Sequence, residues 1–371
     1  MTEAALTERE AEASIAQALT GACDWDRCGP EALARVPALA LSHGVEGLLW
    51  TELSGIRAAA AVRDALTPTV RAAVARDMLV QRELQGITTA LAQETVAALI
   101  TKGSALAYSA YPEPWLRPRV DTDVLVRQGD VATATGVLER CGYVRSDATN
   151  TGALVSHQIG FERAGSHDIR HVIDLHWKIV NPHIVADALA FDDLWRSSSA
   201  APALGPAARV PGAVESIAIS CIHRLAHHQR HDRLIWLYDL RLLSASLDAK
   251  GWLALRDLAC GRQIAGLCVD GLRAARSRVG GMLPADIEAA LAEAAPSEPS
   301  RVYLQGNLSK SDVLLSDLKT LATWGARLRL LREHVFPPPA FIQQRYGTRA
   351  RVLLPAFYLH RLIAGASRWV R

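Results

Sequence analysis

Two aspartates, Asp121 and Asp123, stand two residues apart in a segment whose neighbours are mostly apolar. An apolar run of this length predicts a buried strand, and residues two apart in a strand project from the same face. Two carboxylates held side by side repel each other and lose hydration unless positive charge lies between them. A divalent cation supplies that charge, so the pair is a candidate metal site. The alternative is an acidic strand edge in solvent.

A turn of small residues precedes this pair. Lys102, Gly103 and Ser104 end a short predicted strand, and a helix-like segment follows them. Such a turn lets the backbone approach a triphosphate and directs N–H groups at it, to which Lys102 adds charge. The alternatives are a common surface turn and a solvated lysine. Phosphate bound by backbone and metal bound by acids is the arrangement expected for nucleotidyl transfer.

A third acid lies in the alternating segment 170–179, where Asp174 and His176 share one face. Asp121, Asp123 and Asp174 together suit Mg²⁺ (or Mn²⁺), which binds a few carboxylates along with phosphate oxygens and water. We expect His176 to orient a metal-bound acid or to contact the nucleotide. The alternative is a core histidine between strands.

Two arginines, Arg117 and Arg119, flank the acids. They are candidates to neutralise the charge that develops on the transferred phosphate. The alternative is structural pairing with Asp121 or Glu113.

A third candidate group lies further along the chain, in a helical segment. His223, His227 and His231 recur at a spacing of four residues, which places them on one helix face and suggests zinc. No ligand nearby clearly completes such a site. We therefore favour a polar cleft between the sheet and a helical domain, with Arg233 and Asp239 also in it. Asp239 lies among leucines and needs a His or Arg partner if buried.

Periodicity divides the chain into helical ends and a strand-containing centre. Strands are predicted at 96–101, 120–127, 155–163 and 170–179, with a helix at 130–141 and a linker at 198–211. Helices are predicted at 31–54 and 57–94, with breaks near Gly55 and Pro68, and at 214–230, 232–247, 252–278, 284–294, 311–333 and 350–368. The expected fold is α+β, a small mixed sheet flanked by helices. Its parts are an N-terminal helical region (1–95), a catalytic core (96–200) and a C-terminal helical domain with a basic tail (201–371).

Composition excludes several classes of protein. The 371 residues carry a net charge of only +3, which does not indicate a nucleic-acid partner for the chain as a whole. Half of the residues are hydrophobic, which is enough for a sizeable core. Six cysteines without a C-x-x-C pair disfavour that type of zinc site. No signal peptide or membrane-spanning run is recognisable, which predicts a cytoplasmic protein, and the Ala/Arg-rich composition suggests a bacterium.

The last part of the chain is the exception in charge. Residues 321–371 contain nine arginines and a single acid, Glu333. This tail predicts either a solvated helical surface or a surface that binds phosphate or a partner, with RNA among the candidates.

The order of these motifs resembles the bacterial "uncharacterised nucleotidyltransferase" family of the DNA polymerase beta-like superfamily. The resemblance covers most of the chain from about residue 40. It rests on Lys102-Gly103-Ser104, Tyr111-Pro112, Arg117, Asp121-Thr-Asp123, Gly142-Tyr143, Asp174-Leu-His176-Trp177, His223, His227, Arg233-Leu-Ile-Trp236-Leu-Tyr-Asp239, Phe336-Pro337, Arg345-Tyr346 and Tyr358-Leu-His-Arg361.

The resemblance implies transfer of a nucleoside monophosphate from an NTP, with ATP expected, and release of pyrophosphate. In that superfamily the first two acids bridge two metal ions and the third binds the ion that activates the acceptor hydroxyl. These roles would fall to Asp121, Asp123 and Asp174 respectively.

The acceptor is not specified by these residues. A small molecule or peptide of a biosynthetic pathway is expected, with RNA modification by a toxin-like enzyme as the rival. The same residues are also compatible with kinase-like phosphoryl transfer on this scaffold and with a catalytically silent nucleotide-binding module.

The metal assignment has two testable consequences, one for variants and one for the structure. Replacing Asp121 or Asp123 by alanine should abolish turnover and leave the fold intact, because it relieves like-charge repulsion. A residue 174 far from 121 and 123, or any of the three acids buried against a lysine or arginine with no open cavity above it, would instead overturn the enzyme interpretation.

Overall fold

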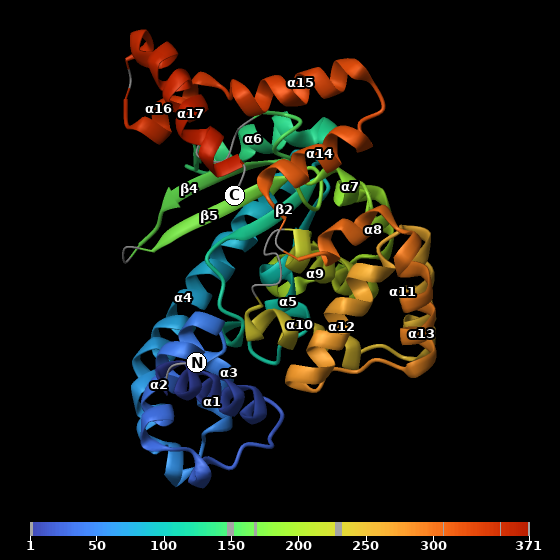
Figure 1. Cartoon of the computed structure of the whole chain (residues 1–371). Coiled ribbons are helices and arrows are strands. Elements are labelled where there is room, and N and C mark those ends of the chain that lie inside the picture. Colours follow the sequence, from blue (N-terminus) through green and yellow to red (C-terminus); the bar gives the residue numbers. More distant parts are fainter. Residues whose placement is uncertain are drawn as a thin grey trace.

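The computed structural model of the chain describes residues 3–146, 152–166, 169–226, 232–306, 308–348 and 350–369 (Figure 1). A mixed seven-stranded sheet lies at the centre, with helices before and after it in the sequence. This arrangement confirms the predicted α+β class, a small mixed sheet with helical flanks.

The sheet has the strand order β3-β4-β5-β2-β1-β7-β6. Parallel pairing joins β2 to β5 and β1 to β7, whereas the other neighbours are antiparallel. The strands are β1 (Ala98–Thr101), β2 (Thr122–Val126), β3 (Val144–Ser146), β4 (Gln158–Ala164), β5 (Arg170–His176), β6 (Ser199–Ala200) and β7 (Arg209–Val210).

The segment predicted as a linker, 198–211, belongs partly to the sheet. Its two short strands pair with each other, and Arg209 of β7 lies opposite Leu99 of β1. The linker prediction was therefore wrong for these strands. The Ala, Pro and Gly content of the segment conceals two strands of two residues each, too short to show alternation.

One face of the sheet packs on α4 (Ala60–Gln93) and α6 (Val131–Arg140), where Val124 and Val126 join a buried cluster. The predicted break near Pro68 does not occur, and α4 continues through that residue. Proline in a helix interior costs about 3 kcal/mol. Burial of Leu66 and Val70 on either side contributes a compensating free energy, since each buried aliphatic side chain is worth about 1.5–3 kcal/mol.

The opposite face of the sheet meets α5 (Lys102–Ser109) and, through Leu99 and Leu125, the larger core formed with the C-terminal helices. Because successive strand residues alternate between faces, Asp123 shares this second face with Leu125. The acidic residues therefore project toward α5 and the helical domain, away from α4.

Helices before the sheet are α1 (Glu3–Ala18), α2 (Pro30–His43) and α3 (Glu46–Glu52). A single helix was predicted over 31–54, but Gly44 ends α2 with a left-handed φ of 69°. Glycine takes that conformation without steric cost, so the chain turns sharply into α3.

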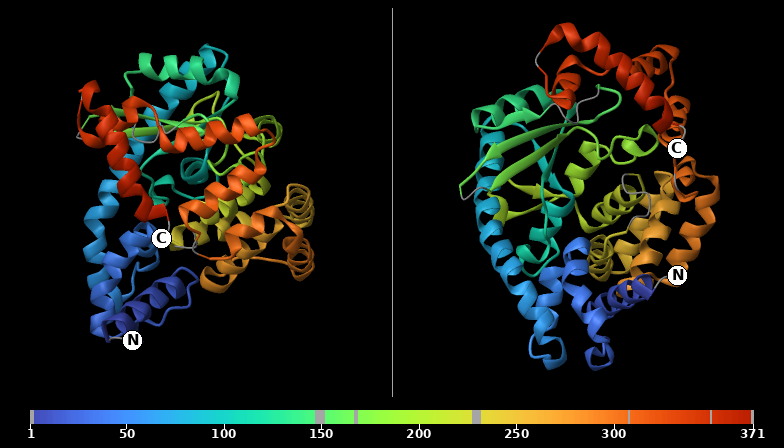
Figure 2. Two further views of the ribbon diagram at one scale, coloured as in Figure 1. Left: turned by 45° about the horizontal axis from the view of Figure 1, so that its top comes forward. Right: turned by 60° about the vertical axis from the view of Figure 1, so that its left-hand side comes forward.

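Helices after the core form a bundle and an outer layer (Figures 1 and 2). The predicted helix 252–278 is two helices separated at Gln263 (φ 57°), and 311–333 is also two, the second capped by Thr323. Within the described residues no helix is long and apolar enough to cross a membrane. The helices are α7 (His183–Ala186), α8 (Phe191–Ser197), α9 (Ala213–Ala226), α10 (Leu234–Ala245), α11 (Ala249–Gly261), α12 (Ala265–Val279), α13 (Ala285–Ala294), α14 (Lys310–Thr320), α15 (Trp324–Val335), α16 (Pro339–Tyr346) and α17 (Leu354–Trp369).

Candidate metal and nucleotide site

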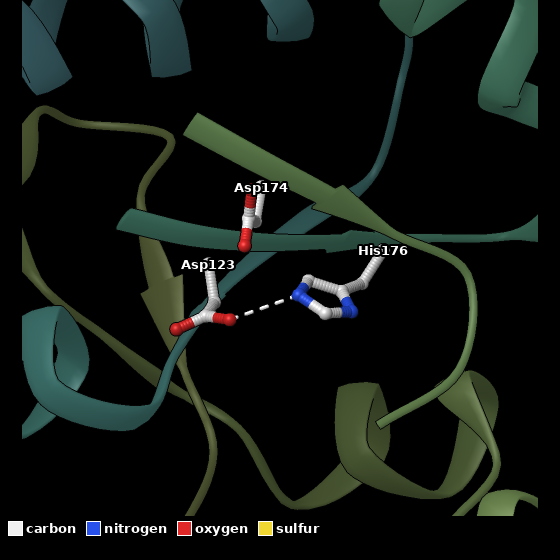
Figure 3. A group of neighbouring side chains, drawn as sticks. All are labelled: Asp123, Asp174 and His176. Atoms are coloured by element: carbon white, nitrogen blue, oxygen red, sulfur yellow. Dashed lines mark ion pairs between the residues drawn. The ribbon is translucent and has the colours of Figure 1, made fainter. Parts of the chain in front are cut away.

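Strand register brings two of the predicted acids together. In the parallel pair of β2 and β5, Asp123 lies directly opposite Asp174 (Figure 3). Adjacent strands are about 4.8 Å apart, so the two carboxylates leave the sheet side by side. His176, two residues beyond Asp174, projects from the same face, and the ligand atoms of all three lie within 4.8 Å of one another.

Asp121 precedes β2 and stands beside this cluster, outside the set of three. Its charge nevertheless helps to raise the pKa of Asp174. The structure thus places two of the three predicted acids in contact distance, the third nearby, and His176 among them.

One participant was missed in the sequence. Gln158 of β4 donates a hydrogen bond of 2.9 Å to Oδ2 of Asp174. Its pairing with His176 across the β4–β5 ladder sets this position. A glutamine at the start of a strand gives no distinctive signal until the strand order is known.

Lys102 contacts the cluster directly. Its Nζ lies 2.5 Å from Oδ1 of Asp123, and both side chains are largely buried. Lys102 starts α5 with a φ of 52°, a left-handed conformation that costs a non-glycine residue about 1–3 kcal/mol. Asp123 is therefore buried against a lysine, which meets the burial part of the condition that would argue against a metal site.

The lysine and the histidine set the charge of Asp123. Burial alone would favour its protonated form, but the Lys102 ammonium and the His176 ring hold its pKa well below the usual range. Burial and Lys102 lower the pKa of His176, so the ring is neutral at pH 7. Its Nε2 lies 2.8 Å from Oδ1 of Asp123, a close polar contact that favours the charged carboxylate.

The remaining acids are short of positive charge. Burial, together with Asp123 and Asp121, raises the pKa of Asp174 to about 6. Burial and Asp123 likewise raise the pKa of Asp121. Lys102 acts on all three carboxylates, and Arg117, already paired with Asp239, adds a weaker attraction at Asp121. Two of the three pKa values remain raised, so the cluster has electrostatic capacity for a further cation.

The predicted phosphate turn is the first turn of α5. The Ser104 hydroxyl is buried, shares a 3.0 Å hydrogen bond with the Thr122 hydroxyl and donates to the Asp121 carbonyl at 3.3 Å. A Cβ at Gly103 would lie 3.4 Å from the Arg117 guanidinium. Ser104 thus fixes the turn to the aspartate strand, and Gly103 rests on an arginine.

Arg117 forms an ion pair with a residue of the C-terminal helical domain. Its guanidinium binds the Asp239 carboxylate through Nε and Nη2 at 2.8 Å each, and Tyr111 donates to the same carboxylate at 2.7 Å. The remaining Nη1 donates to the Pro118 carbonyl. These contacts support structural pairing over the predicted phosphate contact. The partner is Asp239, which has the arginine that its burial requires, and not Asp121 or Glu113.

Arg119 lies apart from the cluster and packs toward α4. It binds Asp77 at 2.5 Å, donates to the Tyr108 hydroxyl at 2.8 Å and lies over that ring. A side chain held in this way is not positioned to neutralise a phosphate near Asp123. The structure again favours a structural role.

The histidine face in the helical segment is described only in part. His223 on α9 packs edge-on against Trp236, and Arg233 donates to the Ser42 carbonyl at the end of α2. His227 and His231 lie outside the described residues. Elsewhere in the described part of the chain, no second group of three His, Cys, Asp or Glu side chains is close enough to hold a metal.

The raised pKa of Asp174 predicts a pH-dependent stability of the metal-free protein. Its folded pKa of about 6 exceeds the ordinary 3.8, so the folded state binds the proton more tightly. The resulting stability is fully present below about pH 4 and is lost as the pH rises through about 6. In EDTA at about pH 8, Asp174→Asn should therefore exceed the wild type by up to about 3 kcal/mol in unfolding free energy.

Thermal melts of both proteins from acid to alkaline pH measure this difference. It should shrink as the pH falls below about 6, where the wild-type carboxyl takes up its proton. A variant that is less stable than the wild type at alkaline pH contradicts the assignment.

Asp123→Ala, in contrast, should have a lower unfolding free energy than the wild type. It leaves the Lys102 ammonium buried without its partner, which costs about 3–5 kcal/mol when one member of a buried pair is removed. The buried pair thus predicts a loss of stability where the sequence alone predicted an intact fold. The double variant Lys102→Met/Asp123→Ala should recover much of the loss in urea unfolding, and equal stability of wild type and Asp123→Ala would refute the buried pair.

A search of curated proteins finds no match. The family model described as "Uncharacterised nucleotidyltransferase" matches residues 31–280, which include the whole sheet, α5 and α10. The resemblance to this family is thereby confirmed over residues 31–280, and the chain belongs to the uncharacterised nucleotidyltransferase family, a family of transferases.

Proposed function

We propose that this chain transfers a nucleoside monophosphate from an NTP to an acceptor hydroxyl, with a divalent metal bound at Asp123 and Asp174. The observation that carries the proposal is the register of β2 and β5, which sets these carboxylates side by side in a member of a nucleotidyltransferase family. Without a cation between them, one of the two is forced toward its neutral form.

The residues present fit a divalent ion. Asp121 and Asp174 have raised pKa values that a cation would lower, and Nε2 of His176 belongs to the same cluster, 2.8 Å from Oδ1 of Asp123. Carboxylate oxygens are the ligands that Mg²⁺ prefers, and Mn²⁺ also accepts imidazole. Asp123 and Asp174 would hold the ion, with Asp121 beside them. When bound, the ion supplies charge neutralisation at the phosphates and a lowered pKa at the attacking hydroxyl.

Lys102 has a double role in this proposal. Its ammonium neutralises Asp123 in the absence of metal, at 2.5 Å. With a divalent ion held at the same carboxylate that contact would be unnecessary, and the Lys102 ammonium would be free to turn toward a triphosphate at the start of α5. The left-handed backbone at Lys102 supports this role, because strain of this kind is typical of functional sites.

Catalysis then consists mainly of positioning. The first turn of α5 directs unpaired backbone N–H groups toward the nucleotide, and Ser104 keeps that turn against the aspartate strand. The pKa of Asp174, about 6, is close to neutral pH, so this carboxyl group readily loses its proton. In the proposed reaction Asp174 orients the acceptor. Transfer of this kind needs aligned phosphate and neutralised charge and no covalent nucleophile on the protein.

The reaction is tested with NTPs labelled in the α-phosphate, ATP first, and cell extract as the source of acceptors. Label should move from the α-phosphate to an acceptor with release of pyrophosphate, and should stop in EDTA. Asp174→Asn and Asp121→Asn should lower the rate by about 100-fold or more, as for a lost transition-state interaction. Both variants keep the Lys102–Asp123 pair, so they separate loss of chemistry from loss of fold.

Asp187→Asn is the matched control, because Asp187 is an exposed acid paired with Lys178. It should retain full activity. Label that moves only from the γ-phosphate would replace the proposal with kinase-like transfer, and full activity of Asp174→Asn would refute the metal site. The labelled product identifies whether the acceptor is a small molecule, a peptide or RNA.

Because Lys102 and a metal ion would compete for the Asp123 carboxylate, the proposal also predicts how removal of the lysine changes metal binding. Lys102→Met removes the competing ammonium, so Mn²⁺ should bind the variant about tenfold more tightly than the wild type. Calorimetry or electron paramagnetic resonance of Mn²⁺ without nucleotide measures this, and the same variant should lose nucleotidyl transfer. Weaker Mn²⁺ binding would contradict the exchange, whereas no binding by either protein would contradict the metal site itself.

A further inference from the structure

The C-terminal helices carry most of the charge imbalance of the chain. Residues 321–371 hold nine of the 41 basic residues and one of the 38 acids, so this segment has a charge of +8. The remaining 320 residues hold 32 basic residues against 37 acids and have a charge of −5. A positive terminal segment on a negative body points to a partner specific to that segment.

The first of these helices has an apolar stripe in solvent. On α15, Trp324 is 76% exposed and Leu328 is 64% exposed, and Leu331 continues the same face at helical spacing. Leu330, on the other side of the helix, is buried and attaches α15 to the protein.

A second stripe lies on the last helix and on the turn before it. Val352 is 84% exposed, Leu359 is 59% exposed and Ile363 is 69% exposed, again at spacings that share one helix face. Of the eighteen large hydrophobic residues found exposed in the described chain, nine lie between 324 and 363. We call this set the C-terminal surface: Trp324, Leu328, Leu331, Phe336, Val352, Leu353, Leu359, Leu362 and Ile363.

The two stripes belong to one folded layer. Tyr358 of α17 donates a 2.6 Å hydrogen bond to the Pro337 carbonyl just after α15, and its ring packs on Phe336 at 5.8 Å. Arg361 also donates to the His334 carbonyl. This layer lies at the end of the molecule opposite α1–α3 (Figures 1 and 2), so a partner could reach it without contacting the N-terminal helices.

Exposed arginines lie on the same C-terminal segment as the apolar side chains. Arg332, Arg345 and Arg351 are exposed, and the single acid, Glu333, is mostly buried. Glu333 is occupied by Arg329 and by the Leu154 N–H. No described acid of the segment 321–363 therefore offsets the arginines at this surface.

Exposed aliphatic and aromatic residues interspersed with arginine match an anionic lipid surface. A membrane buries the apolar stripe and also pairs the arginines with headgroups. RNA would pair the arginines and leave the leucines, valine and isoleucine in water. A symmetric contact between the C-terminal surfaces of two copies would place two positive surfaces together. We propose that the C-terminal surface binds the face of an anionic membrane peripherally.

Co-flotation of the full-length protein with vesicles tests this proposal. Vesicles that contain phosphatidylglycerol should bind the protein, vesicles of phosphatidylcholine alone should not, and salt should weaken the binding. Arg332→Glu/Arg345→Glu/Arg351→Glu should weaken it by roughly 100-fold, since each basic residue near the surface contributes about fivefold. Leu328→Gln/Leu359→Gln/Ile363→Gln should weaken it through lost burial.

Matched controls use exposed positions outside the C-terminal surface. Arg35→Glu/Arg57→Glu/Arg71→Glu makes the same change in net charge, and Met78→Gln/Leu253→Gln removes exposed apolar side chains. Both should bind vesicles as the wild type does. Absence of flotation, equal loss in the controls, displacement of the bound vesicles by RNA, or a dimer in solution that the Leu328 variant disrupts would each overturn the proposal.

Discussion

The parallel pairing of β2 with β5 is the constraint on which the candidate site depends. A shift of one residue in this register would move every side chain of β5 to the other face and would turn Asp174 and His176 toward the α4 core. The apolar residues prevent that shift, because Ile173 and Leu175 must remain in the cluster formed with α4 and α6. The burial of aliphatic side chains on one face therefore holds mutually repelling carboxylates together on the other.

Alternation and motif order made much of this arrangement predictable. Asp174 and His176 share a face because they are two apart in β5, and the same rule predicted Asp121 beside Asp123, although Asp121 precedes β2. The family resemblance then implied that Asp174 joins the other two acids at one metal site. The cluster and its candidate chemistry followed from local pattern together with one topological assumption.

Other parts of the site were not predictable, because they depend on long-range contacts. Arg117 was expected near phosphate, yet its partner Asp239 is 122 residues away on another helix. The contact of Lys102 with Asp123 needs a left-handed backbone that no lysine pattern indicates. Short strands such as β7 and helix breaks such as the one at Gln263 also escape periodicity, because tertiary packing decides them.

The buried pair of Arg117 and Asp239 has a consequence for how the chain can be divided. A fragment that ended near residue 200 would retain the arginine, lose its carboxylate and expose the edge of β1 that β7 covers. A fragment that began there would bury an aspartate with no counterion. Neither half is therefore expected to be a self-sufficient folding unit, and a natural fusion or circular rearrangement of this family should preserve both segments in one polypeptide.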